Sequence, residues 1–467
     1  MRRALSLTYL FTLSLFIAQA NTSDLKLKSI STPTTLIADT AYNLELEIEN
    51  LSGDTVRQVI LVYSDSQNSY FDTLTGISLA AGASMLVSHS TSFSYTVGQQ
   101  SLSLAAYPVA DLDSTNNTGT LTIDFLKFIP ETKVVIEEGT GTWCGWCPRG
   151  AVAMEYMSIN YPNDFIGIAV HNGDPMADGL YNHGAGITGF PGMNVDRDVM
   201  GAGVDTQTME YYYLSRKDQI RDGEISITSN SVHNYYGSTE VTVEARFAKN
   251  LIGDYRIAVV VVEDSVWGRG SSWGQRNYYA GGVNGTLSGA GHDWHLEPDP
   301  VQGGYMWYDH VGRQLLGGYD GQEGSIPDTI VAGETYTYTF TDNTQIKTDD
   351  FLKVSFVALL LDPQGRIVNA HKTPANVLLS QEEEISSAIL YPNPSKGLVN
   401  LNLNLLNSNK VELSLFDNLG RIVDQSTLNL SKGKQVISKD FSHLPKGMYF
   451  LKINANQHSI SKPIILE

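Results

Sequence analysis

The sequence has only two cysteines among its 467 residues, and charged side chains make up just 17% of it. A scaffold held together by many disulfides is therefore excluded, and large hydrophobic cores must stabilise the fold. Basic residues are also few, with 31 Lys and Arg against 50 Asp and Glu, so the formal charge is −19. A nucleic-acid or anionic lipid partner, which would need a basic face, is therefore not expected.

Long hydrophobic runs are scarce as well, and the one candidate lies at the N-terminus. Arg2 and Arg3 precede a mostly apolar run at 5–17, and the small residues of AQA at 18–20 suit a cleavage site. This pattern indicates a secretory signal peptide. A membrane anchor is the alternative, but the run is short for a span and polar sequence follows at once. We therefore expect an exported mature chain without a transmembrane segment.

Most of the remaining chain alternates apolar and polar residues, as strands with one solvent-exposed face do. The clearest example is LELEIE at 44–49, and turn residues separate such runs at short intervals. Several short strands with regular turns predict β sandwiches. The expected parts are a signal peptide (1–20), an immunoglobulin-like β sandwich (21–128), an α/β unit (129–222), a second β sandwich (223–378), a linker (379–386) and a small C-terminal β sandwich (387–467).

The α/β unit contains both cysteines. A β-branched run at 133–138 predicts a strand, residues 148–161 predict a helix, and 165–170 predict a second buried strand. A strand–helix–strand unit builds a parallel sheet. Cys144 and Cys147 are therefore expected where the first strand passes into the helix.

This position suits thiol chemistry. Cys144 would lie near the unpaired N–H groups of a helix N-terminus, which favour the thiolate, and Cys147 would lie close enough to close a disulfide. The alternative is a purely structural disulfide. A zinc site is not expected, because the chain has no second cysteine pair. His171 is expected to be an ordinary loop histidine.

Aromatic and histidine residues gather farther along the chain, in a Gly-rich stretch at 265–324. His292 and His295 show no third metal ligand at a suitable spacing, so no metal is expected there. The aromatic side chains either line a binding groove or anchor the loops. They are Trp267, Trp273, Trp294, Trp307 and Tyr308.

The stretch Trp143–Pro148 (WCGWCP) resembles the thioredoxin active-site motif, with Trp146 where thioredoxin has proline. The resemblance covers about 133–221 and implies a thioredoxin-like fold. It also implies that Glu138 is a buried acid that assists proton transfer. Pro191 would then be the cis-proline that faces the cysteines and contacts the substrate backbone.

A wider stretch, 133–375, resembles the 28-kDa outer-membrane protein family of the Bacteroidetes. Members combine a thioredoxin-like fold with a β sandwich, and surface binding has been proposed for them. The motifs that carry the resemblance are EEGTG at 137–141, Trp143-Cys144, Cys147-Pro148, Gly150, Val262-Glu263-Asp264, His310-Val311, Arg313 and Asn369-Ala370.

The last segment resembles the C-terminal sorting domain of the type IX secretion system. That resemblance implies the secretion machinery as a partner and export through the periplasm to the cell surface or the extracellular space. The motifs are YPNP at 391–394, Gly397, DNLGR at 417–421, LPKGMY at 444–449 and Lys462.

Two functions are consistent with the sequence. The first is a thiol–disulfide oxidoreductase acting on protein thiols, with Cys144, Cys147, Glu138 and Pro191 as its site and no cofactor or metal. The second is a cell-surface binding or adhesion protein in which the disulfide is structural. An exposed Cys144 would favour the first function, and a Cys144 buried under loops would favour the second.

Overall fold

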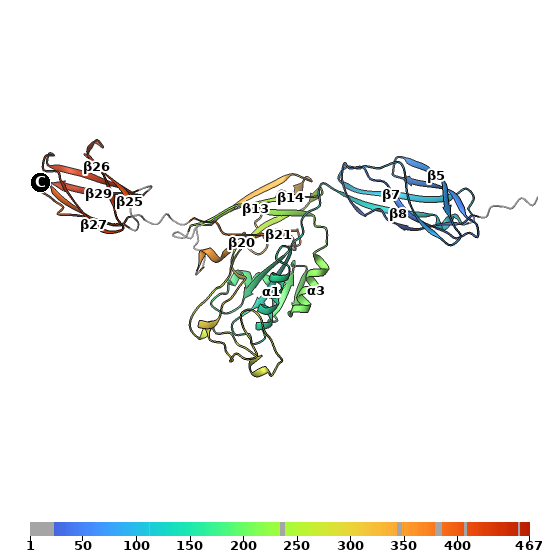
Figure 1. The fold of residues 1–467 in the computed structure, drawn as a ribbon, viewed down its shortest axis with the longest axis horizontal. Helices are drawn as coiled ribbons and strands as arrows, with labels where there is room; N and C mark the ends of the chain where they lie inside the picture. Colours follow the sequence, from blue (N-terminus) through green and yellow to red (C-terminus); the bar gives the residue numbers. More distant parts are fainter. Residues whose placement is uncertain are drawn as a thin grey trace, which may run out of the picture. The chain divides into compact units, whose positions relative to one another are not determined.

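The computed structural model describes residues 23–111, 113–233, 239–342, 348, 350–378, 385–405, 409–455 and 458–467. The expected signal peptide lies outside these residues, as does most of the expected linker. The described chain is mostly β strand, with several sheets and few helices (Figure 1). Within it, no helix combines the length and the apolar character needed to cross a membrane.

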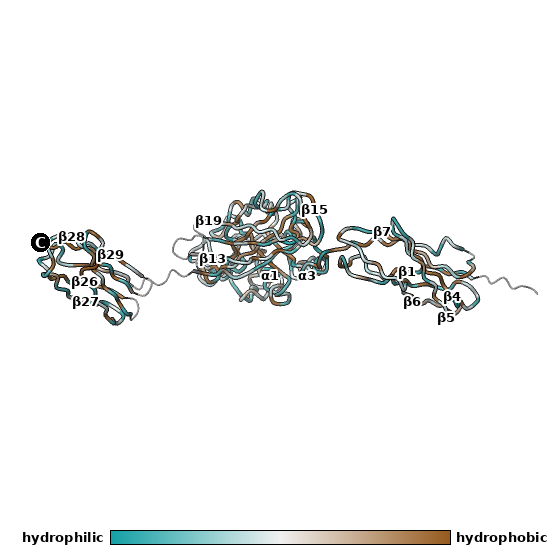
Figure 2. The backbone as a smooth tube through the Cα atoms, turned by 90° about the horizontal axis from the view of Figure 1, so that it is seen from above, coloured by the Kyte–Doolittle hydropathy of each residue, from teal (hydrophilic) through white to brown (hydrophobic). Residues whose placement is uncertain are grey.

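The N-terminal part is a β sandwich of two sheets, ordered β1-β3-β6 and β2-β8-β7-β4-β5. In β3 alternate side chains are buried in a shared hydrophobic core, as the alternating sequence predicted. Figure 2 shows hydrophobic and hydrophilic residues mixed along the backbone of these strands. The strands are β1 (Leu25–Ile30), β2 (Thr35–Ile37), β3 (Glu45–Asn50), β4 (Val56–Ser64), β5 (Ser69–Leu79), β6 (Ser84–Ser88), β7 (Gly98–Pro108) and β8 (Thr118–Leu126).

The central part is built on an eight-stranded sheet of order β12-β11-β9-β10-β17-β16-β20-β21. β9 and β10 are parallel neighbours, as the strand–helix–strand reading predicted. Both are buried on their two faces, which is typical of strands in parallel sheets. The strands are β9 (Val134–Thr140), β10 (Phe165–His171), β11 (Gly192–Val195), β12 (Val199–Gly203), β16 (Arg256–Glu263), β17 (Val311–Leu316), β20 (Val354–Leu361) and β21 (Ile367–Pro374).

The two faces of this sheet pack against different elements. On one face Val134 and Ile136 contact a cluster that includes Met154 and Tyr213 of helices α1 (Pro148–Asn160) and α3 (Thr206–Arg216). On the other face Val135 belongs to a cluster with residues of α2 (Gly179–Ala185), β16 and β20. Successive residues of β9 therefore face opposite sides of the sheet.

Strands from 223–378 are divided between sheets rather than collected in one sandwich. β16, β17, β20 and β21 continue the sheet that contains β9, so the sheet crosses the expected boundary at residue 222. A separate four-stranded sheet has the order β19-β14-β13-β22, and β15 pairs with β18. These strands are β13 (Gly223–His233), β14 (Thr239–Phe247), β15 (Leu251–Ile252), β18 (Thr329–Ile330), β19 (Thr335–Asp342) and β22 (Val377–Leu378).

β16 and β17 are antiparallel neighbours, yet residues 264–310 separate them in the chain. This connection, called the long loop below, has a hydrophobic cluster of its own that includes Trp294 and Met306. Trp146 and Val152, from the CxxC turn and α1, pack against that cluster. The long loop is therefore folded onto the start of α1.

The C-terminal part is a sandwich of two sheets, ordered β23-β24-β27 and β26-β25-β28-β29, around its own core. The strands are β23 (Ile385–Tyr391), β24 (Leu398–Leu405), β25 (Asn409–Phe416), β26 (Ile422–Leu430), β27 (Gly433–Asp440), β28 (Gly447–Ala455) and β29 (His458–Leu466).

Candidate functional site

The two cysteines lie between β9 and α1, where the sequence predicted them. Cys147 is the N-cap residue of α1, and Pro148 occupies the first helical position. Proline is tolerated there because the N–H of the first turn has no helical partner. A disulfide joins Cys144 to Cys147, with their Cα atoms 5.4 Å apart.

The disulfide is covered by the long loop. Cys144 is only 4% exposed and Cys147 only 2% exposed. The Arg276 and Tyr278 backbone N–H groups donate to the carbonyls of Thr142 and Gly145, over 2.7 and 2.9 Å. The Gln275 side-chain amide also donates to the Cys144 carbonyl over 2.9 Å. The backbone around both sulfurs is thus tied to residues 275–278.

Aromatic rings complete this cover. Trp146 makes edge-on contacts with Tyr278 and Tyr279, each with ring centroids 5.6 Å apart. Gly145 lies directly under Tyr278, because a Cβ atom at Gly145 would come within 2.3 Å of that ring. A side chain at position 145 would therefore force the cover to move.

Glu138 lies on the face of β9 that packs against α1. It is only 2% exposed, and its Oε1 has no hydrogen-bond partner. A Cβ atom at Gly150 of α1 would come within 2.2 Å of that oxygen, so glycine makes room for the carboxyl group. Burial raises the pKa of Glu138 well above its ordinary value of 4.5.

Pro191 precedes β11, and the Phe190–Pro191 peptide bond is cis. β11 runs antiparallel to β9, with Gly192 opposite Gly139. The Phe190 ring packs edge-on against Trp143, with centroids 5.3 Å apart. The proline segment is therefore close to the start of the CxxC motif, through Trp143.

A cavity of about 400 Å³ lies beside the disulfide. α1, the ends of β9 and β10, and the long loop all contribute to its wall. Among the residues predicted from the sequence, Cys147 and Glu138 both line it. The other lining residues are Thr140, Pro148, Ala151, Met154, Glu155, Ser158, Ile159, Ala169, His171, Asp264, Gln275, Ala290, Trp294, Met306, Trp307, Tyr308, Asp309 and His310.

Two histidines line this cavity. His171 ends β10, is 3% exposed, and its Nδ1 lies 2.7 Å from an Asp174 carboxyl oxygen, so the expectation of a loop histidine was wrong. His310 Nε2 lies 3.2 Å from the Ser158 hydroxyl, and its Nδ1 lies 3.5 Å from Asp264. Burial lowers the pKa of His310 below 6.5. Sequence reasoning missed the cavity role of His310 and Asp264, although the family motifs included both.

The long-loop histidines serve as anchors in the described structure. His292 Nδ1 lies 3.5 Å from Glu297, and His295 Nδ1 lies 3.2 Å from the Leu287 carbonyl. Of the five aromatic residues named from the sequence, Trp294, Trp307 and Tyr308 line the cavity, whereas Trp267 and Trp273 are not among its described lining residues. Trp294 is buried and lines the cavity, and Trp307 lines it while remaining 57% exposed.

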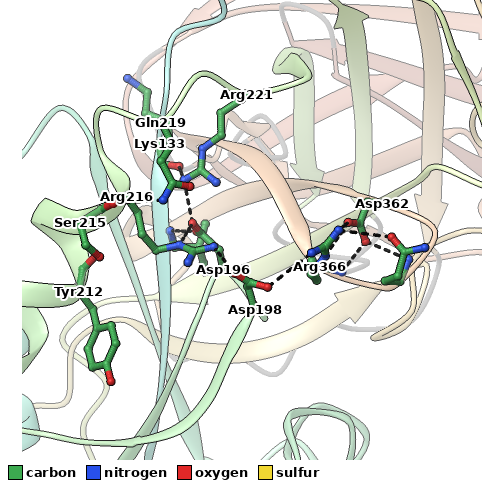
Figure 3. Close-up of polar contacts among 12 residues, drawn as sticks. Lys133, Asp196, Asp198, Tyr212, Ser215, Arg216, Gln219, Arg221, Asp362 and Arg366 are labelled. Carbon is green, nitrogen blue, oxygen red and sulfur yellow. Dashed lines mark hydrogen bonds and ion pairs between the residues drawn. The ribbon is translucent and has the colours of Figure 1, made fainter.

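A second polar cluster joins α3 to β9 (Figure 3), and its residues are not among the described residues that line the cavity. One oxygen of buried Asp196 accepts from Arg216 and Arg221, over 2.9 and 2.7 Å. The other oxygen accepts the Val135 backbone N–H over 2.8 Å. Asp198 pairs with Arg216 as well as Arg366. Through Asp196 this cluster connects α3 with β9.

Comparisons with known families match two segments of the chain. Residues 179–377 match the family described as outer membrane protein Omp28. Residues 389–467 match the secretion system C-terminal sorting domain. The resemblances to the 28-kDa outer-membrane protein family and to the sorting domain are thereby confirmed, although the Omp28 match begins after the cysteine pair. The chain is an exported protein with a disulfide-bonded cysteine pair, and its sorting domain directs it to the cell surface.

Solved structures give more distant similarities. HBP35 of Porphyromonas gingivalis is 16% identical over 72% of this chain and 99% of its own, with a TM-score of 0.40. The CARDB domain of a Pyrococcus furiosus protein is 18% identical over 22% of this chain and 90% of its own, with a TM-score of 0.19. The comparison with curated proteins gave no match.

Proposed function

We propose that this exported protein is a cell-surface binding protein in which the Cys144–Cys147 disulfide is structural. The observation that carries the proposal is the burial of both cysteines beneath residues 275–278 of the long loop. A thiolate must reach a disulfide sulfur to exchange with it, and reactive cysteines are at least partly exposed. A protein substrate has no such access while this cover is closed.

The cover is strong enough to slow exchange markedly. Three hydrogen bonds join residues 275–278 to the turn, from Gln275, Arg276 and Tyr278. Each contributes about 1 kcal/mol, so opening the cover costs about 3 kcal/mol before any ring contact is counted. If only molecules with an open cover can react, this free-energy cost makes exchange about 100-fold slower than at an exposed disulfide.

A second candidate function is thiol–disulfide exchange by a thioredoxin-like unit at about 129–222, with Cys144 attacking and Cys147 resolving. Two features favour it. Glu138 is a buried carboxyl group with a raised pKa, and it lines the same cavity as Cys147. Pro191 lies next to Phe190, whose ring contacts Trp143 at the start of the CxxC motif. In this function the cover would have to open for each substrate.

Reduction kinetics separate the two functions. The purified protein is treated with dithiothreitol, and the free thiols are counted over time by alkylation and mass spectrometry. We expect slow reduction of the wild type. Gly145→Ala should accelerate it by about 10- to 100-fold, because the new methyl group displaces Tyr278. Gly304→Ala, at a glycine with open space around it, is the matched control and should have no effect.

A trapping experiment tests the redox candidate directly. If Cys147→Ser accumulates mixed disulfides on Cys144 with protein thiols, and the wild type is reduced as fast as an exposed disulfide, the structural assignment is wrong. If neither Cys147→Ser nor Cys144→Ser forms such adducts, the thioredoxin-like unit serves as a scaffold only.

A further inference from the structure

We propose that the cavity beside the disulfide binds a small organic cation, such as an amine with an aromatic body. This inference rests on the proposed binding function and names its ligand class. The cavity volume of about 400 Å³ lies within the range of small-molecule sites, roughly 300–1,000 Å³. Its wall combines apolar side chains with a few polar groups, as ligand sites do.

Charge is the first argument. Four carboxyl groups line the cavity, and no Lys or Arg is among its described lining residues. With a formal charge of −19 on the whole chain, the surroundings also repel anions. The four are Glu138, Glu155, Asp264 and Asp309.

Glu138 is the second and independent argument. Its side chain is nearly fully buried, its Oε1 has no partner in the described part of the chain, and it lines the cavity. A buried polar atom without a partner costs about 1–3 kcal/mol, so it is kept only where something offsets that cost. The other three acids each accept a backbone N–H: Glu155 from Ala290, Asp264 from His310 and Asp309 from Ser265. Of the four acids, Glu138 is the one with a buried oxygen that has no hydrogen-bond partner among the described residues.

Aromatic side chains supply the third argument. Trp294, Trp307 and Tyr308 line the same cavity. The faces of such rings attract cations, and the attraction grows when the cation loses water. Because Trp307 is also exposed, the cavity opens to solvent beside it. A cation could therefore enter past Trp307 and reach the Glu138 carboxyl group in the interior.

Binding should release a proton. Burial keeps Glu138 protonated above its usual range, and an ammonium group beside it would favour the carboxylate. The O–H bond of Glu138 then breaks and the proton passes to the buffer, so charge balances as the cation enters. Other titratable groups also face this space. They are Glu155 on α1, His171 at the end of β10, Asp174 behind His171, and Asp264, Tyr308, Asp309 and His310 on the long loop.

Calorimetry with three matched indoles tests the proposal on the mature full-length protein at pH 6. The probes are tryptamine (a cation), tryptophol (neutral) and indole-3-propionate (an anion). We expect tryptamine to bind about tenfold or more tighter than tryptophol, and indole-3-propionate to bind weakest. Titrations in two buffers of different ionisation enthalpy should report up to one proton released per tryptamine bound.

Glu138→Gln assigns the effect to one residue. This variant should lower the tryptamine affinity to that of tryptophol, leave tryptophol unchanged and abolish the proton release. Glu323→Gln, at an exposed acid outside the cavity lining, is the matched control and should behave as the wild type. Trp307→Ala, at an exposed ring, should weaken tryptamine about three- to tenfold without affecting folding.

Three results would overturn the proposal. They are equal binding of tryptamine and tryptophol, an unchanged tryptamine affinity in Glu138→Gln, and no binding of any probe. Each of them leaves the structural role of the disulfide standing, because that role is judged by reduction kinetics. Rapid disulfide exchange with intact tryptamine binding would instead overturn the structural role alone.

Discussion

The two faces of β9 treat neighbouring carboxyl groups in opposite ways. Glu137 is fully buried and is bound by Arg197, whose Nη2 donates over 2.7 Å. The Tyr181 and Tyr319 hydroxyls also donate to it, over 2.8 and 3.3 Å. Glu138, one residue later, faces α1 and the cavity with one oxygen unpaired.

The difference lies in whether the protein supplies partners for each buried carboxyl group. Arg197 forms an ion pair with Glu137, so the buried charge on that face of the sheet has a counter-charge. Desolvation is uncompensated at Glu138, and the raised pKa is the result. Perturbed titratable groups gather at functional sites, so the incomplete face is where a ligand or a proton transfer is expected.

Glu137→Gln should give the largest effect. It leaves the Arg197 guanidinium buried without its counter-charge, so we expect a loss of about 3–5 kcal/mol in the free energy of unfolding. Urea denaturation followed by tryptophan fluorescence measures it, because all six tryptophans lie between residues 143 and 307. The double variant Glu137→Gln with Arg197→Met should lose less than the sum of the two single variants. Simple additivity would contradict the pairing.

Glu138→Gln should change the pH dependence rather than the fold. In the wild type the folded state keeps this proton at pH values where the unfolded chain has lost it. The free energy of unfolding should therefore fall as pH rises from about 4.5 to the raised pKa of Glu138, by up to about 1.4 kcal/mol per pH unit. Glu138→Gln should lack this component, so the variant gains stability over the wild type as pH rises. Parallel pH profiles for the two proteins would show that Glu138 ionises freely.

Tyr181→Phe should have an intermediate effect. Its ring is fully buried and its hydroxyl donates to Glu137 over 2.8 Å, so the variant leaves a buried carboxylate oxygen with one donor fewer. We expect a loss of about 1–3 kcal/mol in the same denaturation assay. A loss no greater than that of a surface Tyr→Phe variant would mean that Arg197 alone satisfies Glu137.

Tyr319→Phe should be the mildest of the four changes. Its hydroxyl donates to Glu137 over a longer distance of 3.3 Å. The Phe ring would still lie against the Arg197 guanidinium, whose Cζ is 3.6 Å from the centroid of the Tyr319 ring. We expect a loss of about 0.5–1 kcal/mol. A larger loss than that of Tyr181→Phe would mean that Tyr319, rather than Tyr181, makes the stronger contact with Glu137.

The elements around the site follow from local pattern. The β-branched run at 133–138 and the helix at 148–161 became β9 and α1 almost residue for residue. β-branched residues and a proline at the first helical position carry that information locally. The β-branched run could not say what each face of β9 would meet.

The contacts around the candidate site are long-range and had no local signal. Nothing in the sequence near Cys144 indicates that residues 275–278 cover it, since the contact joins segments far apart in the chain. The same holds for Arg197 opposite Glu137, and for the sheet that continues past residue 222. Glu138 was singled out only through its resemblance to thioredoxin, because an acid inside a strand gives no pattern of its own.

The long loop joins β16 to β17, which are already neighbours in the sheet. A connection between such strands needs only a few residues, so this one is an insertion that the sheet does not require. It supplies the lid over the disulfide and much of the cavity wall. Residues 264–310 could therefore change in sequence and length, and with them the cover of the disulfide and the cavity wall, without any change in the pairing of β16 with β17.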